Sequence, residues 1–183
     1  METKKYKLTE ETIIVNGKTL YRIEALKDFS NVRKGDKGGF IEKEDNLSQS
    51  DNCWVYDNAM VYDNARVFGN AMVYGTARVY DDAMVYGKAK VRDNVIIYNN
   101  AIICGNAWVY GNAVICSNAW VYGNADVFGD AVIGDNAVIC GNAWVNGNTK
   151  VYGNAKVYGE AMVYGEADVC GNAEVCGDME VYD

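Results

Sequence analysis

A six-residue repeat fills most of this chain and limits what it can fold into. From Trp54 to Met179 the sequence reads as 21 consecutive units of the type Trp-Val-Tyr-Gly-Asn-Ala, without one insertion or deletion, and a partial unit follows at 180–183. Self-similarity at a fixed short period is typical of solenoids, in which each unit packs only on its neighbours. The repeat therefore predicts a rod of stacked units.

Two places of each unit are restricted to apolar residues. The second place, from Val55 to Val181, is always valine or isoleucine, and the sixth is alanine except at Val95, Thr149 and Met179. β-Branched residues favour extended backbone, and neighbours in a strand point to opposite faces. Each unit is thus expected to be a short strand with its second place inward, followed by a Gly/Asn/Asp corner that tolerates positive φ.

Three units are expected to close one triangular turn of 18 residues, so the 21 units predict about seven turns. Strands of successive turns would stack at about 4.8 Å, and residues 18 apart would lie directly above one another. Alanine at the sixth place is then a packing requirement, because three corners converge on a narrow axis. The predicted fold class is all-β: a parallel β-helix with a small N-terminal β-hairpin cap.

The repeat resembles that of a known superfamily. The stretch Val132-Ile133-Gly134-Asp135-Asn136-Ala137-Val138-Ile139 looks like the hexapeptide repeat of left-handed parallel β-helices, known from trimeric acyltransferases and γ-type carbonic anhydrases. The resemblance, and not the residue pattern, implies the left-handed winding. The lead-in segments 21–29 and 35–42 resemble those of bacterial and phage proteins of the YdcK type, which are often labelled transferases on fold grounds.

The first 53 residues differ in kind from the repeat. Residues 13–15 and 18–26 are expected to form a hairpin around the turn Asn16-Gly17. The spacing of Asp45-Asn46 and Asp51-Asn52 extends the six-residue rhythm backward and puts Lys43 and Gln49 at the core place. We therefore expect a β cap over 1–41 that covers the first edge, and the β-helix over 42–183 with an irregular start.

The composition excludes several chemistries. The chain has no histidine, so it lacks the base that the resembling acyltransferases use and the ligands of a carbonic anhydrase zinc site. The uninterrupted repeat also leaves little concavity for a substrate. The sequence predicts no catalytic residues, no metal site and no cofactor. An enzyme is not the favoured reading, although a divergent or inactive hexapeptide acyltransferase stays open.

The six cysteines are predicted to be reduced within one chain. Five of them occupy the outward third place at separations other than 18, too far apart for a disulfide, and Cys53 falls at an inward corner. Reduced thiols, a net charge of -8 and the lack of a signal-like or membrane-length apolar segment favour a cytoplasmic protein that binds neither membranes nor nucleic acid.

The outward places suggest surfaces for binding. Aromatic residues at the third place should stack along the rod, which stabilises it without any ligand. They could also bind a protein or a glycan, and this candidate aromatic surface comprises Trp108, Tyr110, Tyr122 and Trp144. Apolar residues at the first place gather in the middle turns and form a candidate surface for self-association, which comprises Ile96, Ile102, Val114, Trp120, Val132 and Val138.

We thus expect a non-catalytic scaffold or binding protein that acts through its outer faces as a homo-oligomer, a trimer or a dimer. Drift among tolerant surface positions is the plain alternative for the apolar residues. A second functional alternative is an inhibitor of the phage type. The last turns, from Glu160 to Asp183, carry acidic residues and no basic residue, so they could occupy the nucleic-acid site of a host protein. Discouraging edge pairing is the simpler reading of those charges.

Overall fold

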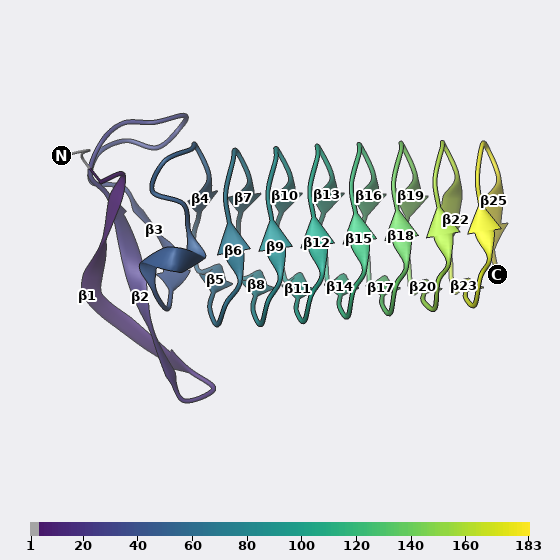
Figure 1. Ribbon diagram of the computed structural model, residues 1–183, viewed down its shortest axis with the longest axis horizontal. Helices are drawn as coiled ribbons and strands as arrows, with labels where there is room; N and C mark the ends of the chain where they lie inside the picture. The colour runs from purple at the N-terminus through teal and green to yellow at the C-terminus, as the bar shows by residue number, and fades with distance from the viewer. Residues whose placement is uncertain (1–3) are drawn as a thin grey trace.

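The computed structural model describes residues 4–183 and shows a parallel β-solenoid that is continuous with an N-terminal hairpin (Figure 1). β1 (Tyr6–Val15) and β2 (Lys18–Ala25) pair antiparallel, and β3 (Lys37–Ile41) pairs antiparallel with β2. The predicted hairpin is confirmed, since Asn16 and Gly17 take the positive φ values of 50° and 77° that a tight two-residue turn requires. A short 3-10 helix, η1 (Glu44–Asn46), precedes the regular repeat.

Every unit of the repeat forms one short strand, and the strands build three parallel sheets. Sheet I continues from β1, β2 and β3 into β5 (Met60–Val61), β8 (Arg78–Val79), β11 (Ile96–Ile97), β14 (Val114–Ile115), β17 (Val132–Ile133), β20 (Lys150–Val151) and β23 (Asp168–Val169). Sheet II comprises β4 (Trp54–Val55), β7 (Met72–Val73), β10 (Lys90–Val91), β13 (Trp108–Val109), β16 (Asp126–Val127), β19 (Trp144–Val145), β22 (Met162–Tyr164) and β25 (Glu180–Tyr182). Sheet III comprises β6 (Arg66–Val67), β9 (Met84–Val85), β12 (Ile102–Ile103), β15 (Trp120–Val121), β18 (Val138–Ile139), β21 (Lys156–Val157) and β24 (Glu174–Val175).

The register between turns is 18 residues, as the repeat predicts. Val109 pairs with Val127, and the backbone N–H groups of Trp108 and Tyr110 donate to the carbonyls of Ala125 and Val127 at 2.9 and 3.0 Å. Sheet II has 8 strands, so the solenoid has about eight turns, one more than the 21 full units predicted. The difference arises at both ends: Ile41 and Leu47 pair with Val61 and Val67 and so form a first, irregular turn with β4, and the partial unit at the C-terminal end forms β25.

The core is a narrow column of valine, isoleucine and alanine. Second-place residues such as Ile115 and sixth-place residues such as Ala119 have no exposed surface in the central turns. The corners are held by ladders of side chains at the fourth and fifth places. Asn106 donates from its amide to Asn124 one turn on at 3.0 Å, and the carboxylate of Asp93 accepts from the N–H of Gly111 at 3.1 Å. These bonds satisfy polar groups that the tight corners would otherwise leave without partners.

The start of the solenoid differs from the extrapolated six-residue rhythm. Ile41 pairs with Val61 and Leu47 bridges Val67, so both pairs are offset by 20 residues rather than 18. Ile41 and Leu47 therefore take the core places, where Lys43 and Gln49 were expected. Two extra residues between Leu47 and Trp54 absorb the shift, and the polar side chains of this segment stay outside the core.

The cap is joined to the solenoid by buried contacts over long sequence distances. Lys5 is 1 % exposed, and its ammonium donates to the carbonyls of Asp51 and Cys53 at 3.1 and 2.9 Å. Burial lowers the pKa of Lys5 and raises the pKa of the Cys53 thiol, which lies 3.4 Å from the ammonium. The Trp54 ring packs edge-on against Tyr6 and Phe29. Cap and solenoid therefore share one hydrophobic core.

The buried hydroxyl of Thr149 leads to a prediction about the free energy of unfolding. Thr149 occupies the alanine place and is fully buried, and its Oγ1 has no hydrogen-bond partner. A buried hydroxyl without a partner costs free energy, so Thr149→Val should raise the free energy of unfolding by about 1 kcal/mol. Valine already fits at the equivalent Val95, which is fully buried as well. Urea unfolding followed by circular dichroism measures the change, and a lower stability of the valine variant would contradict it.

Candidate interaction surface

The first-place and third-place side chains form two rows on the outside of each sheet. They alternate with the buried valine or isoleucine between them, so they must point outward. In sheet I, Ile96 pairs with Val114 and Val114 with Val132, so these three predicted residues are neighbours over three turns. In sheet III, Ile102, Trp120 and Val138 are neighbours in the same way. The structure thus brings the six residues together as two short rows on two adjacent sheets.

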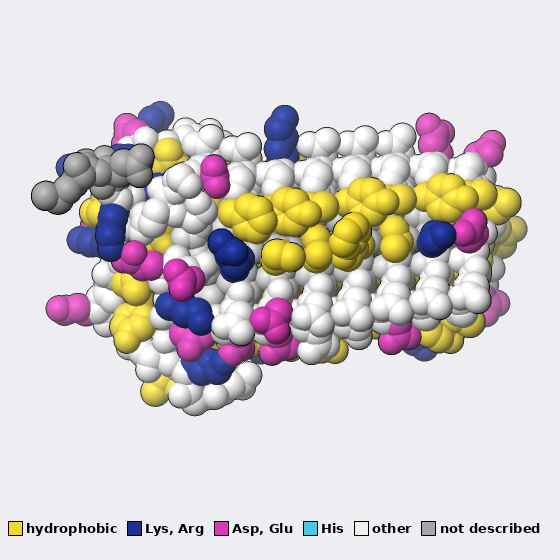
Figure 2. Space-filling view, in the orientation of Figure 1, with side chains coloured by type: hydrophobic (Ala, Val, Ile, Leu, Met, Phe, Trp, Pro, Cys, Tyr) yellow, Lys and Arg dark blue, Asp and Glu magenta, His cyan; other side chains and the backbone are white. Residues whose placement is uncertain are grey.

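Sheet III carries the longest uncharged surface. Met84 extends its first-place row by one turn, because it pairs with Ile102. Figure 2 shows this face, with two lines of hydrophobic side chains running along the solenoid and charged groups at both ends of the lower line. We call it the sheet III face. Its first-place row is Arg66, Met84, Ile102, Trp120, Val138, Lys156 and Glu174, and its third-place row is Phe68, Tyr86, Cys104, Tyr122, Cys140, Tyr158 and Cys176.

The tyrosines of this face stay uncharged at neutral pH. The thiol of Cys140, one turn on, raises the pKa of Tyr122, and Cys104 does the same for Tyr86. The thiol of Cys176 raises the pKa of Tyr158 to about 12. The Trp120 ring packs edge-on against Tyr122 and keeps 47 % of its surface exposed. The middle of the face is therefore apolar and open to a partner.

Met84 and the tyrosines Tyr86 and Tyr158 were not in the predicted set of site residues. Their signal is present in the sequence, because all of them lie at multiples of 18 residues from predicted members. The prediction weighed the first places of the middle turns most heavily and so missed the longer continuity of the sheet III rows. A count of uncharged places along each column of 18 would have found it.

The predicted aromatic surface is divided between two faces. Trp108, Tyr110 and Trp144 lie on sheet II, whereas Tyr122 belongs to sheet III. Asp126 separates Trp108 from Trp144, with which it pairs on either side. Lys90 places its ammonium 4.4 Å from the ring centre of Trp108. Charged groups thus interrupt the sheet II face, and its tryptophans act as separate exposed rings rather than as one patch.

The tyrosine columns also contribute to stability. Tyr62, Tyr80 and Tyr98 stack face to face with ring centres 5.0 and 5.3 Å apart, and Tyr110 stacks on Phe128 at 4.7 Å. Burial raises the pKa of Tyr56 to about 12, where its ring stacks on Tyr74. These stacks confirm the predicted alignment of third-place aromatics and shield the interturn hydrogen bonds beneath them.

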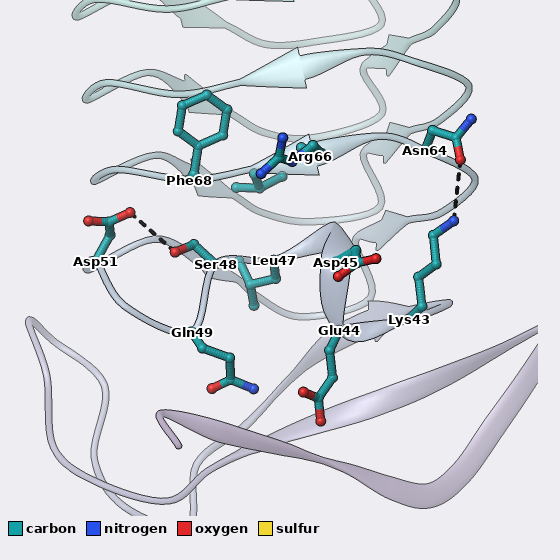
Figure 3. A pocket seen from close by; sticks show the side chains of 11 residues that line it. Lys43, Glu44, Asp45, Leu47, Ser48, Gln49, Asp51, Asn64, Arg66 and Phe68 are labelled. Carbon is teal, nitrogen blue, oxygen red and sulfur yellow. Dashed lines mark hydrogen bonds between the residues drawn. The ribbon is translucent and has the colours of Figure 1, made fainter. Parts of the chain in front are cut away.

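A polar hollow of about 750 Å³ lies where the cap meets the first turns (Figure 3). Its polar side chains bind one another and the cap. The Lys43 ammonium donates to Asn64 at 3.3 Å, and Ser48 donates to the Asp51 carboxylate at 3.2 Å. Gln49 accepts from the backbone N–H of Lys5 at 2.9 Å. The contacts give these side chains a structural role in closing the first turn.

The six described cysteines form no disulfide with one another, and Glu174 of the acidic last turns is ion-paired. All six thiols are free, as their spacing predicts, and Cys53 is buried. Within residues 4–183, no group of His, Cys, Asp and Glu could hold a metal ion, and no helix is long and apolar enough to cross a membrane. In the last turns Glu174 is paired with Lys156 at 3.0 Å, which neutralises part of the acidic stretch.

The family comparison agrees with this architecture. Residues 77–93 match the family model of the YdcK β-solenoid repeat, over about one turn. The chain is a β-solenoid repeat protein. The 18-residue register of this turn continues in the neighbouring turns of the structure. A comparison with curated proteins found no match to the chain.

Proposed function

We propose that this chain is a non-catalytic β-solenoid scaffold that associates with a second copy of itself through the outer faces of its central turns. The observation that carries the proposal is the uncharged surface on sheets I and III, built from Ile96, Val114 and Val132 and from Ile102, Trp120 and Val138. Trp120 and Val132 are 47 % and 37 % exposed. Apolar surface of this extent marks interaction sites in soluble proteins.

Self-association fits this surface better than a changing set of partners. The solenoid presents a flat and regular face, and such a face can match a second copy of itself because the side-chain positions of both copies have the same spacing. The central turns lack lysine, arginine and acidic first-place residues on sheets I and III, which matches the depletion of charge at the core of protein interfaces.

A double substitution tests the proposal. Val114→Glu with Val138→Glu places one carboxylate at the centre of each row, where association would bury it without a partner. We expect sedimentation velocity to show an oligomer for the unchanged protein and a monomer for the double variant. Circular dichroism should show the same β content for both, since the two side chains point away from the core.

The matched control carries the same charge change on the third face. Trp108→Glu with Trp144→Glu adds two carboxylates to exposed places of sheet II and should leave the sedimentation coefficient at the oligomer value. An oligomer that persists in the Val114/Val138 variant, or a monomer for the unchanged protein at tens of micromolar, would contradict the proposal.

A further inference from the structure

We infer that two copies pair in an antiparallel manner through the sheet III face, related by a two-fold axis that lies between the two solenoids at the level of Trp120. The inference rests on the proposed function and specifies its partner and register. A two-fold axis in the interface, perpendicular to the long axis, sets each row against its own counterpart in reverse order. Trp120 then faces the partner's Trp120, and Ile102 faces the partner's Val138.

The charges at the two ends of the face become complementary in this register. Arg66 begins the first-place row and Glu174 ends it, so each Arg66 lies opposite the partner's Glu174. Figure 2 shows charged groups at the two ends of this row. Lys156, which is bound to Glu174 of its own chain at 3.0 Å, lies opposite the partner's Met84 and can cover it with its aliphatic stem. The apolar middle is thus closed by an ion pair at each end.

Two competing arrangements oppose like charges. A shift of one turn on the same face can set Arg66 opposite the partner's Lys156. The equivalent antiparallel pairing on sheet I, centred on Val114, sets Arg78 opposite the partner's Lys150. Like charges in an interface disfavour wrong pairings and fix the register. The opposite shift of one turn opposes no like charges, but it shortens the overlap and loses both Arg66–Glu174 pairs. The charges along the two sheets therefore favour sheet III and the two-fold at Trp120.

The size of the face suits a specific but reversible dimer. Seven strands at about 4.8 Å and a side of about 17 Å bury roughly 500 Å² per copy, or about 1,000 Å² in total, near the lower limit of specific interfaces. The dimer should therefore dissociate on dilution.

The third-place row supplies native reporters of the register. The two-fold at Trp120 sets Cys104 opposite the partner's Cys140, so two symmetric thiol pairs lie one turn on either side of the centre. Both thiols are partly exposed. A two-fold axis along the solenoid would instead set the third-place row against the first-place row, and neither thiol would meet another thiol.

Chemical cross-linking tests the register in the full chain. A variant with Cys116→Ser, Cys170→Ser and Cys176→Ser keeps Cys104, Cys140 and the buried Cys53. A short bismaleimide, which alkylates one thiol at each end, should convert it to a covalent dimer. Adding Cys104→Ser or Cys140→Ser should abolish the covalent dimer, because each pair needs one of each thiol. A control variant instead carries Cys104→Ser, Cys140→Ser and Cys176→Ser and keeps Cys116 and Cys170 of sheet I. It measures cross-linking by random collision and should stay monomeric on a denaturing gel after the same treatment.

Charge reversal supplies a second readout. Arg66→Glu or Glu174→Arg alone should raise the dimer Kd about 10-fold in sedimentation equilibrium, and the two together should restore it, since the pair is reversed rather than broken.

The outcomes separate the two proposals. A dimer by sedimentation without the Cys104–Cys140 cross-link, or a cross-link that survives either single serine variant, overturns the register but leaves self-association intact. A monomer at all concentrations overturns both.

Discussion

Trp54→Ala should lower the free energy of unfolding by about 3 to 5 kcal/mol, the range for removing a large aromatic side chain from a core. Trp54 is 1 % exposed, and its ring centre lies 6.0 Å from that of Tyr6 and 5.3 Å from that of Phe29. The alanine variant would leave a cavity between the cap and the first turn. We expect the cap to separate first on heating, as a new low-temperature transition in circular dichroism.

The sequence offers a matched control for this change. Trp108 occupies the same place of the repeat on the same sheet, three turns further on, but is 40 % exposed. Trp108→Ala loses the contacts of the ring with the Lys90 ammonium and the Arg92 guanidinium and should cost less than about 1 kcal/mol. Equal losses for the two tryptophans would show that the cap does not depend on Trp54.

Val79→Asp should remove at least about 4 kcal/mol and unfold the turns around it, because it buries a carboxylate in a column of valine and alanine. Val79 has no exposed surface and pairs with Val61 and Ile97. Each turn of a solenoid depends on its direct neighbours, so the damage should be local at first. Limited proteolysis should cut the variant near residues 70–90, and the unchanged protein should resist.

The same aspartate at the neighbouring residue, Arg78, should have little effect on stability. Arg78 precedes Val79 in β8 and is exposed, so Arg78→Asp should change stability by no more than about 0.5 kcal/mol. A similar loss for both variants would mean that the alternation of inward and outward places does not hold in this strand. That result would also remove the basis for assigning the outer rows.

The regular part of the fold could be predicted because every turn repeats the same pattern of residue types. A β-branched residue at each second place and alanine at nearly every sixth fix the inward positions, and the 18-residue turn follows from three corners per coil. The pairing of Val109 with Val127 confirms this register, and the free thiols follow from it. The hairpin around Asn16-Gly17 could be predicted for a similar reason, since two adjacent residues that tolerate positive φ determine its turn.

The irregular start could not be predicted from the rhythm. Extrapolation placed Lys43 and Gln49 in the core, whereas the two-residue shift before Trp54 puts Ile41 and Leu47 there. The contact of Lys5 with Cys53 joins residues 48 apart and has no period to reveal it. Contacts of this kind depend on how the hairpin folds back on the first turn, which no local pattern encodes.

The sequence by itself determined the solenoid, its inward column and the composition of each outer row, because side chains 18 apart must stack when every corner has the same length. Only the tertiary structure decided how the cap closes the first turn, with Ile41 and Leu47 at core places and Lys5 bound to Cys53. It also showed that Lys156 and Glu174 pair with each other at one end of the sheet III face. These features depend on how the hairpin folds back onto the first turn and on which side chains of neighbouring turns bind each other. Residue spacing places side chains in a column but does not determine these contacts.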